Sequence, residues 1–430
     1  MSSFVLKNVI LPNNQVTDVL VDGSKIAGVE SGLTASESID CSGLRILPGF
    51  VDLHTHLREP GFEQSETVLT GTQSAALGGF TAVHAMANTS PVADNLAVVE
   101  LVRNLGIRAG YCDVFPVGAV TKGLAGAQLA DLASMANSQA AVRVFSDDGK
   151  CVSDALVMRS ALEYTKAFGG VIAQHAQEPT LTVDAQMNEG AISAKLGLKG
   201  WPAMAEESII ARDVLLAEHT GGRLHICHLS TAGSVEVVRW AKSRGINVTA
   251  EVTPHHLLLT EELLEGYDTR YKVNPPLRKD SDVMALRQAL VDGTIDIIAT
   301  DHAPHSAELK DCEWSSAAFG MVGLETAASI AQLVLIDSGQ SNWQRMAEVL
   351  SHKPAEIGRD SNQGESIVVG STANLVLIDA GAERNMASKS ASKSQNNPFA
   401  DMKLPGVVVH TIYRGEFTVK NSKLQRMEQK

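Results

Sequence analysis

The sequence lacks the cysteine pattern of a disulfide-stapled or zinc-knuckle protein. Its five cysteines are scattered singly along 430 residues, and no two of them form a CxxC pair. An odd number of widely spaced cysteines argues against a disulfide framework. The pattern fits a reducing compartment, where thiols stay free.

Long apolar runs and blocks of positive charge are also missing. No stretch approaches the ~18 apolar residues of a membrane span, and residues 1–14 have no basic segment typical of a secretory signal. The formal net charge is -13, without a cluster of lysine and arginine. Nucleic-acid binding needs such a cluster to neutralise phosphates. We therefore expect a cytoplasmic protein that binds neither membranes nor nucleic acids.

The middle of the chain alternates between short β-branched segments and longer amphipathic ones. Eight segments have the composition of buried strands: 50–57, 81–86, 111–117, 142–148, 171–176, 224–230, 247–254 and 296–303. Helical spacing of apolar residues is clearest in 206–219 and in 235–244, where Gly245 marks a helix end. Eight β-then-α units predict an α/β protein with a TIM-type (β/α)₈ barrel over residues 49–363.

Both ends of the chain have a different pattern. Residues 1–48 and 364–430 contain short alternating segments separated by turn residues, which predict antiparallel strands. Since each tail alone is too short for a stable core, we predict that the two together form one small β domain. Residues 383–399 are rich in Ser, Lys and Asn, and we predict a long loop there.

His54 and His56 are the first residues that point to chemistry. Two histidines at positions i and i+2 of a strand project from the same face. At the C-terminal end of the first barrel strand, that face is the mouth where barrel active sites lie. Two imidazoles there can share a divalent metal. The pair alone is equally compatible with two buried, hydrogen-bonded histidines.

Polar side chains also end several later strands. Asp147 and Asp148 end the segment 142–148, and His175, His228 and Asp301 occupy equivalent places further on. Burying such groups unpaired is costly, so their recurrence favours a shared metal site. The set is too large for one tetrahedral zinc with an open position. It suits two metals joined by a carboxylate. The two metals would lower the pKa of a water that they share and so yield hydroxide.

Other histidines are interpreted as structural. His225 lies three residues before His228 and faces the opposite side of the strand, so we assign it no ligand role. His84, His255 and His256 are interpreted as core or supporting residues.

Five longer motifs complete the pattern: HLREPG, MANTSPVADN, KVNPPLR, ATDHAPHSAELK and FGMVGLET. With the flanking β segments, they make the chain resemble, nearly end to end, the dihydroorotase branch of the amidohydrolase superfamily. The resemblance is to the bacterial type in which an aspartate bridges the metals. It implies a zinc-dependent enzyme that interconverts L-dihydroorotate and N-carbamoyl-L-aspartate in pyrimidine synthesis, using a metal-bridging hydroxide and an aspartate base.

The resemblance also implies the site residues and two zinc ions per chain. The metal ligands would be His54 and His56 for one ion, His175 and His228 for the other, Asp148 as the bridge and Asp301 as ligand and catalytic base. The substrate would be held by Arg58, Asn88, Asn274 and His305, with the backbone of Val322 and Gly323.

The residues themselves support some of these roles better than others. The guanidinium of Arg58 lies two residues past His56 and can bind a carboxylate through two hydrogen bonds, although a structural salt bridge is the alternative. Asn88 and Asn274 each stand near proline and could be turn formers.

Three points at the site stay open. Many relatives bridge their metals with a carboxylated lysine, so Lys150 competes with Asp148, as does the neighbouring Asp147. Ala87 stands where the family usually has proline. Where the family usually has HAED after strand five, this chain has Gln177-Glu178 in place of the Glu-Asp pair. This difference could alter the hydrogen bonds that support His175.

Two other functions fit the same residues less well. A hydantoinase or allantoinase need not place an arginine for a substrate carboxylate, as Arg58 is placed here. An inactive structural partner of aspartate carbamoyltransferase would be expected to lose metal ligands, and all six are present. The expected partners are the small-molecule substrate, further copies of the chain in a homo-oligomer and, as an additional candidate, aspartate carbamoyltransferase.

Overall fold

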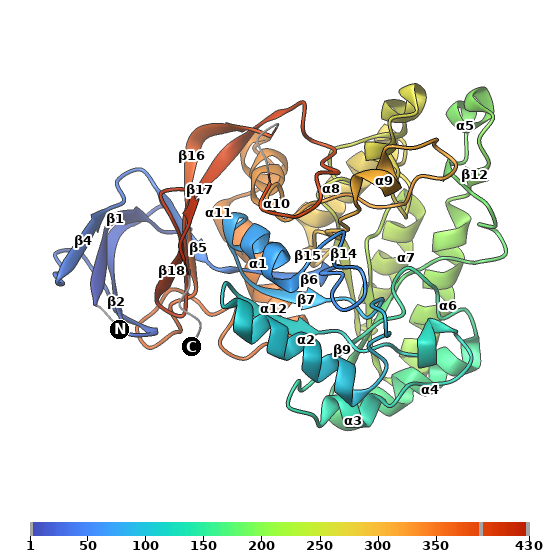
Figure 1. Ribbon diagram of the computed structural model, residues 1–430, viewed down its shortest axis with the longest axis horizontal. Helices are drawn as coiled ribbons and strands as arrows, with labels where there is room; N and C mark the ends of the chain where they lie inside the picture. Colours follow the sequence, from blue (N-terminus) through green and yellow to red (C-terminus); the bar gives the residue numbers. More distant parts are fainter. Residues whose placement is uncertain (1–2, 387–389, 427–430) are drawn as a thin grey trace.

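The structure is a computed structural model that describes residues 3–386 and 390–426. A group of short parallel strands with helices outside it forms the larger part of the molecule, and a long twisted sheet, mostly antiparallel, stands at one side (Figure 1). The first and last strands of the chain, β1 and β19, both belong to that sheet. None of the described helices is long and apolar enough to cross a bilayer.

Each of the eight predicted central strands is present, and most are shorter than the pattern indicated. They are β6 (Phe50–Thr55), β7 (Phe80–Ala85), β8 (Asp113–Pro116), β9 (Val144–Phe145), β10 (Val171–Gln174), β13 (Arg223–Ile226), β14 (Val248–Val252) and β15 (Ile297–Ile298). Several polar residues that were predicted to end these strands lie in the segments that follow them. His56 and Asp301, for example, lie beyond β6 and β15.

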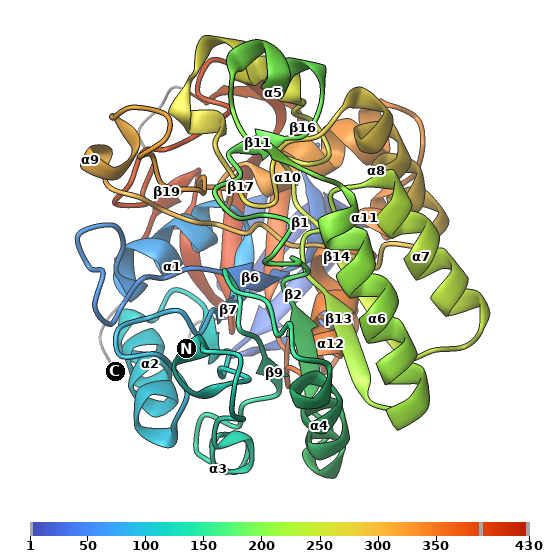
Figure 2. The ribbon, with the colours of Figure 1, turned by 90° about the vertical axis from the view of Figure 1, so that its right-hand side faces the viewer.

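The central strands pair in parallel in two groups. One runs β6-β7-β8, and the other runs β15-β14-β13-β10-β9. Isolated parallel bridges join the groups at both edges, from Gly118 to Phe145 and from Thr55 to His302. Figure 2 shows helices arranged around these strands. The strand ends that carry the candidate ligands are therefore neighbours in space.

The longer helices lie outside these strands (Figure 2). The longer ones are α1 (Val68–Leu77), α2 (Leu96–Ala109), α4 (Ala155–Thr165), α6 (Met204–Thr220), α7 (Ala232–Ser243) and α8 (Asp280–Asp292). The shorter ones are α3 (Leu132–Ala136), α5 (Ala191–Leu196), α9 (Ala307–Lys310), α10 (Ala327–Ala331), α11 (Trp343–Ala347) and α12 (Lys353–Gly358). Two strand pieces, β11 (Met187–Asn188) and β12 (Gly200–Trp201), pair outside the central group. The helices predicted at 206–219 and 235–244 are α6 and α7.

The ends of α2 show how the sequence sets a helix. The side-chain oxygen of Asn95 accepts hydrogen bonds from the backbone N–H groups of Ala97 and Val98 at the start. This satisfies donors that have no partner within the helix. The helix ends at Gly110, whose φ of 74° lies in the left-handed region that glycine tolerates.

The side sheet contains strands from both ends of the chain. It is nine-stranded in the described residues and comprises β1 (Phe4–Ile10), β2 (Val16–Asp22), β3 (Lys25–Val29), β4 (Glu37–Asp40), β5 (Arg45–Pro48), β16 (Leu375–Asn385), β17 (Lys403–Tyr413), β18 (Glu416–Lys420) and β19 (Lys423–Leu424). The two ends meet where β5 pairs antiparallel with β16, for example Ile46 with Leu377. The prediction of antiparallel strands was wrong for β4 and β5, which pair in parallel with β1, because the alternation of apolar residues does not fix strand direction. A separate apolar core that includes Phe4, Ile46 and Ile412 stabilises the sheet.

The predicted loop at 383–399 was wrong at its start. Glu383 and Arg384 belong to β16, where they pair with Pro405 and Leu404 of β17. These positions are polar because β16 and β17 extend here as a partly exposed ribbon, so the hydrophobic alternation that identifies a strand is absent. Residues 387–389 of that loop lie outside the described residues.

A buried histidine in the side sheet should make stability sensitive to acid. His410 of β17 is 2% exposed, and its Nδ1 accepts a hydrogen bond from the Asn421 N–H at 3.3 Å. Burial, aided by Lys420, lowers the pKa of His410 from 6.5 to about 4. Between these values the unfolded chain binds a proton that the folded chain does not, so stability falls as pH drops from about 6.5 toward about 4.

His410→Gln should therefore flatten the dependence of Tm on pH in that window. The measurement is thermal unfolding of wild type and variant at half-unit pH steps. His219→Gln, which alters an exposed histidine, is the control and should follow the wild-type curve. Parallel curves for wild type and His410→Gln would contradict the prediction.

Candidate metal centre and substrate site

Six side chains selected from the sequence converge at the C-terminal ends of the central strands. They are His54, His56, Asp148, His175, His228 and Asp301, and none is more than 5% exposed. So many titratable groups are not buried together without a compensating partner.

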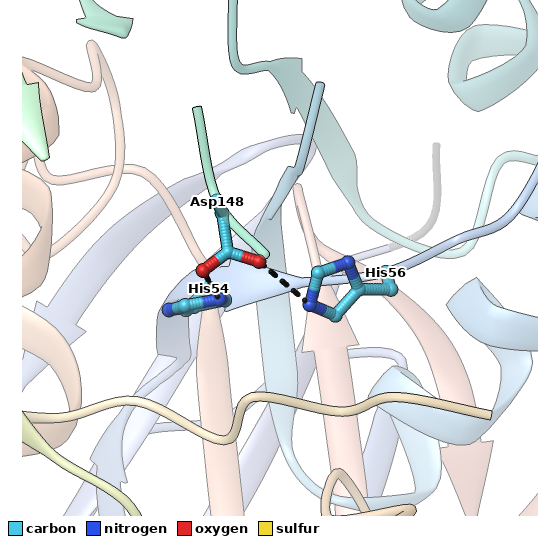
Figure 3. Close-up of side chains that lie close together, drawn as sticks. All are labelled: His54, His56 and Asp148. Atoms are coloured by element: carbon cyan, nitrogen blue, oxygen red, sulfur yellow. Dashed lines mark ion pairs between the residues drawn. The ribbon is translucent and has the colours of Figure 1, made fainter. Parts of the chain in front are cut away.

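Asp148 lies at the centre of the cluster. Its Oδ1 is 3.4 Å from His54 Nε2, 3.3 Å from His175 Nδ1 and 3.5 Å from His228 Nε2. Its Oδ2 is 3.3 Å from His56 Nε2. Figure 3 shows the carboxylate between His54 and His56. Through its two oxygens, Asp148 therefore lies against all four histidines of the cluster.

Asp301 also lies against the first two histidines of the cluster. Its Oδ1 is 3.1 Å from His56 Nε2 and 3.4 Å from His54 Nε2. Asp301 has a backbone φ of 46° and His228 one of 33°, both in the left-handed region. Such conformations cost energy in residues other than glycine and are concentrated at functional sites.

The donor atoms fit divalent metal ions. The Nε2 of His54 is buried without a hydrogen-bond partner in the described residues. The Nδ1 of His175 and the Nε2 of His228 face each other at 2.9 Å. Ligand atoms of His54, His56 and Asp148, and again those of Asp148, His175 and His228, lie within 4.8 Å of one another. Imidazole nitrogens and carboxylate oxygens are the ligands that zinc binds.

Both acids of the cluster are held in the charged form. Burial alone would raise the pKa of Asp148 and of Asp301, but the surrounding histidines, led by His54, lower both below the usual value of 3.8. Two carboxylates that stay ionised beside four imidazoles provide the negative charge that a cation requires.

Glu251 of β14 supports the cluster from behind and was missed in the sequence analysis. Its Oε1 accepts from His54 Nδ1 at 2.6 Å and from the His228 N–H at 3.1 Å, and its Oε2 accepts from His225 Nε2 at 3.0 Å. Burial would raise the pKa of Glu251, but His54 and His225 lower it to about 2. The sequence signal that could have identified Glu251 is the presence of an acid within the otherwise apolar strand segment 247–254.

Two further histidines of the cluster also have a partner on the other ring nitrogen. His56 Nδ1 lies 2.9 Å from Asn88 Oδ1, and His175 Nε2 lies 2.8 Å from Gln177 Oε1. These oxygens accept the ring N–H, which leaves the opposite nitrogen of each ring unprotonated and facing the cluster. Asn88, predicted to bind substrate, therefore also orients His56.

The structure brings neither Asp147 nor Lys150 to the cluster. The carboxylate of Asp147 accepts the backbone N–H groups of Val120 and Thr121 at 2.8 and 2.9 Å, together with the Thr121 hydroxyl. Lys150 is exposed. Asp148 is the acid of strand four that lies among the histidines.

Arg58 and His305 lie side by side next to the cluster. Arg58 Nε donates to Pro304 O at 3.1 Å, and burial lowers the Arg58 pKa to about 10, so the guanidinium stays charged near neutral pH. His305 Nε2 donates to Phe319 O at 2.8 Å. Burial first, and then Arg58, lower the His305 pKa to about 3, so this ring is neutral. Of these two side chains, Arg58 is therefore the one that offers a positive charge to an anionic group beside the cluster.

The other predicted substrate residues have mixed surroundings. Asn274 donates through Nδ2 to Gln177 Oε1 at 3.1 Å, while its Oδ1 is buried without a partner in the described residues. The amide N–H groups of Val322 and Gly323 already donate to Asn396 O and His302 Nδ1, at 3.1 and 3.2 Å. A contact of these two residues with substrate stays a prediction.

The remaining histidines lie in the surrounding structure. His84 bonds Asp360 at 2.8 Å, and His225 contacts Glu251. His256 lies against Thr253, and His255 packs beside it. His302, which was not considered in the sequence analysis, positions Gly323 and lies 3.3 Å from Glu66. None of these is placed among the six clustered side chains.

Known proteins resemble the chain in sequence and in fold. A family model described as Dihydro-orotase-like matches residues 43–234. A dihydroorotase of Leifsonia xyli is 62% identical over 97% of this chain and 96% of its own length, and one of Streptomyces coelicolor is 60% identical over 99% and 100%. The solved structure of an L-hydantoinase (dihydropyrimidinase) from Arthrobacter aurescens has a TM-score of 0.87, at 25% identity over 99% of this chain and 98% of its own.

These relatives extend across nearly the whole chain, including the segments that carry the buried His/Asp cluster and Arg58. By sequence, the chain belongs to the dihydroorotase family.

Proposed function

We propose that the chain is an enzyme that hydrolyses L-dihydroorotate reversibly to N-carbamoyl-L-aspartate, a step of pyrimidine biosynthesis. The observation that carries the proposal is the charged Arg58 beside the buried cluster of four histidines and two aspartates. The cluster suits hydrolysis of an amide, and the arginine suits a ring that bears a carboxylate. The names of the relatives agree with this substrate.

The metals in this proposal are two zinc ions per chain. His54 and His56 would hold one, His175 and His228 the other, with Asp148 shared and Asp301 as a further ligand. When bound, such ions lower the pKa of water to give a nucleophile and polarise the amide carbonyl.

The chain itself supplies binding and proton transfer. Arg58 binds the substrate carboxylate, with His305 and Asn88 beside it, and thereby fixes the ring carbonyl at the cluster. The carboxylate of Asp301 takes the proton of the attacking water and delivers it to the ring nitrogen as the C–N bond breaks. In the direction of ring closure, the same carboxylate takes the proton from the ureido nitrogen.

The proposal also includes a closed barrel, a composite β domain and a location in the cytoplasm. The parallel bridges at both edges of the two strand groups support a closed (β/α)₈ barrel over residues 49–363. The shared sheet supports a composite β domain from 1–48 and 364–430. The described cysteines are free, which suits the reducing cytoplasm.

Homo-oligomerisation and association with aspartate carbamoyltransferase are further parts of the proposal. Sedimentation of the protein with and without that enzyme tests both.

The substrate is tested by comparing rings. Hydrolysis of dihydroorotate, dihydrouracil, hydantoin and allantoin is measured with the purified protein, and we expect the highest kcat/KM for dihydroorotate. Faster turnover of a ring without the carboxylate would overturn the proposal in favour of a hydantoinase, the activity named for several structural neighbours.

Metal removal gives a second test. Protein purified without chelator should contain two zinc ions per chain by elemental analysis. Dialysis against a chelator should remove turnover, and added Zn²⁺ should restore it, because the buried cluster then regains its cations. Fewer than one zinc per chain, or undiminished turnover after chelation, would contradict the proposed role of the metals.

A further inference from the structure

Gln177 connects two parts of the site that the proposed mechanism treats separately. It follows His175 by two residues, beyond the end of β10. Its Oε1 accepts from His175 Nε2 at 2.8 Å and from Asn274 Nδ2 at 3.1 Å. One amide oxygen thus contacts both a proposed metal ligand and a proposed substrate residue.

The orientation of the Gln177 amide is fixed by a neighbouring hydroxyl. Gln177 Nε2 donates to Thr182 Oγ1 at 2.8 Å, and Thr182 Oγ1 donates its own proton to Glu178 O at 3.1 Å. Since that hydroxyl proton is committed to a carbonyl, the hydroxyl oxygen must accept from an N–H group. The NH₂ group of Gln177 therefore faces Thr182, and its oxygen faces His175 and Asn274.

This orientation determines what both partners present to the site. His175 must carry its proton on Nε2, which leaves Nδ1 unprotonated toward Asp148 and His228. Asn274 must use Nδ2 for Gln177, which leaves Oδ1 as its open atom, and that atom is buried without a partner in the described residues. A buried acceptor of this kind is costly unless a ligand donates to it.

We propose that Gln177 is a positioning residue that sets the tautomer of His175 and the amide orientation of Asn274, so that Asn274 Oδ1 accepts an N–H of the substrate ring. The inference rests on the proposed function for its substrate, although the effect on His175 does not depend on it. With the amide of Asn274 reversed, an NH₂ group would oppose the ring N–H, and two donors would face each other without an acceptor.

The test uses the zinc-loaded enzyme and separates metal binding from substrate binding. Gln177→Met keeps the length of the side chain and removes both hydrogen bonds. We expect its zinc affinity, measured by competition with a chelating dye, to fall about tenfold, since loss of a partner to a metal-bound histidine costs 10–100-fold. Asn274→Ala should leave the zinc affinity unchanged.

Substrate binding should reveal the coupling. We expect Gln177→Met and Asn274→Ala each to raise KM for dihydroorotate about tenfold. The double variant should have a KM no higher than that of the single variant with the higher KM, because Gln177 acts on substrate through Asn274. Gln177→Glu retains an acceptor for both partners and should restore zinc affinity and KM. Gln139→Met, at an exposed glutamine, is the matched control.

Two results would overturn the inference. One is a Gln177→Met enzyme with wild-type zinc affinity and wild-type KM, and the other is a double variant whose KM effects multiply. If Gln177→Met does not fold, Thr182→Val replaces it, because loss of the Thr182 acceptor frees the amide to rotate and should raise KM several-fold. If wild type does not hydrolyse dihydroorotate, the proposed function fails, and the zinc-affinity comparison still decides the role of Gln177 at His175.

Discussion

Asp301→Asn is expected to lower kcat for dihydroorotate hydrolysis by about 10³-fold or more. The amide has nearly the same shape as the carboxylate but cannot take a proton from water or return it to the ring nitrogen, and proton transfer of this kind contributes about 10²–10⁴-fold. Asp301 is also 3.1 Å from His56, so the substitution removes a negative charge from the cluster. Steady-state kinetics together with zinc content measure the two effects.

Asp311→Asn is the control, since Asp311 is an exposed acid on a neighbouring surface segment. Its kcat should equal that of wild type. An Asp301→Asn enzyme that contains two zinc ions and retains a tenth of the wild-type kcat would show that another group moves the proton.

The site could be anticipated from sequence because its residues come from strand ends. His54, His56, His175 and His228 each follow a short apolar segment that reads as a strand without reference to the rest of the chain. The parallel pairing of β10 with β13, and the parallel bridges that join their group to the group of β6, then bring these ends together, since parallel strands present their C-terminal ends at the same edge. Convergence of the ligands thus follows from local patterns plus one rule of topology.

The supporting contacts could not be anticipated in this way. Glu251 reaches His54 across 197 positions of sequence, and His302 supports Gly323 through a ring nitrogen whose partner depends on loop conformation. A strand pattern gives the face of a side chain but not which atom of a distant residue it meets. The choice between Asp147 and Asp148 as the acid of the cluster also depends on a distant contact. Only the position of Thr121, whose N–H donates to Asp147, shows that Asp147 bonds the backbone and that Asp148 is the acid of the cluster.

Substrate selectivity should depend on Arg58 more than on any other side chain outside the cluster. Arg58→Met is expected to raise KM for dihydroorotate about 100-fold, because a charge-assisted pair of hydrogen bonds to the carboxylate, worth about 1.5–3 kcal/mol, is lost. The zinc content should not change, since Arg58 donates to Pro304 O and to none of the six clustered side chains. Kinetics with dihydroorotate and with dihydrouracil, which has no carboxylate, measure the effect.

The comparison of the two rings makes the Arg58 prediction specific. Dihydrouracil hydrolysis, where measurable, should be nearly the same in wild type and Arg58→Met, so that the preference for dihydroorotate falls by the full 100-fold. Arg58→Lys should lie between them, because an ammonium retains the charge but cannot form the paired geometry of a guanidinium. Loss of zinc from Arg58→Met, or an equal loss of activity on both rings, would place Arg58 in support of the cluster and leave the carboxylate without an assigned cation.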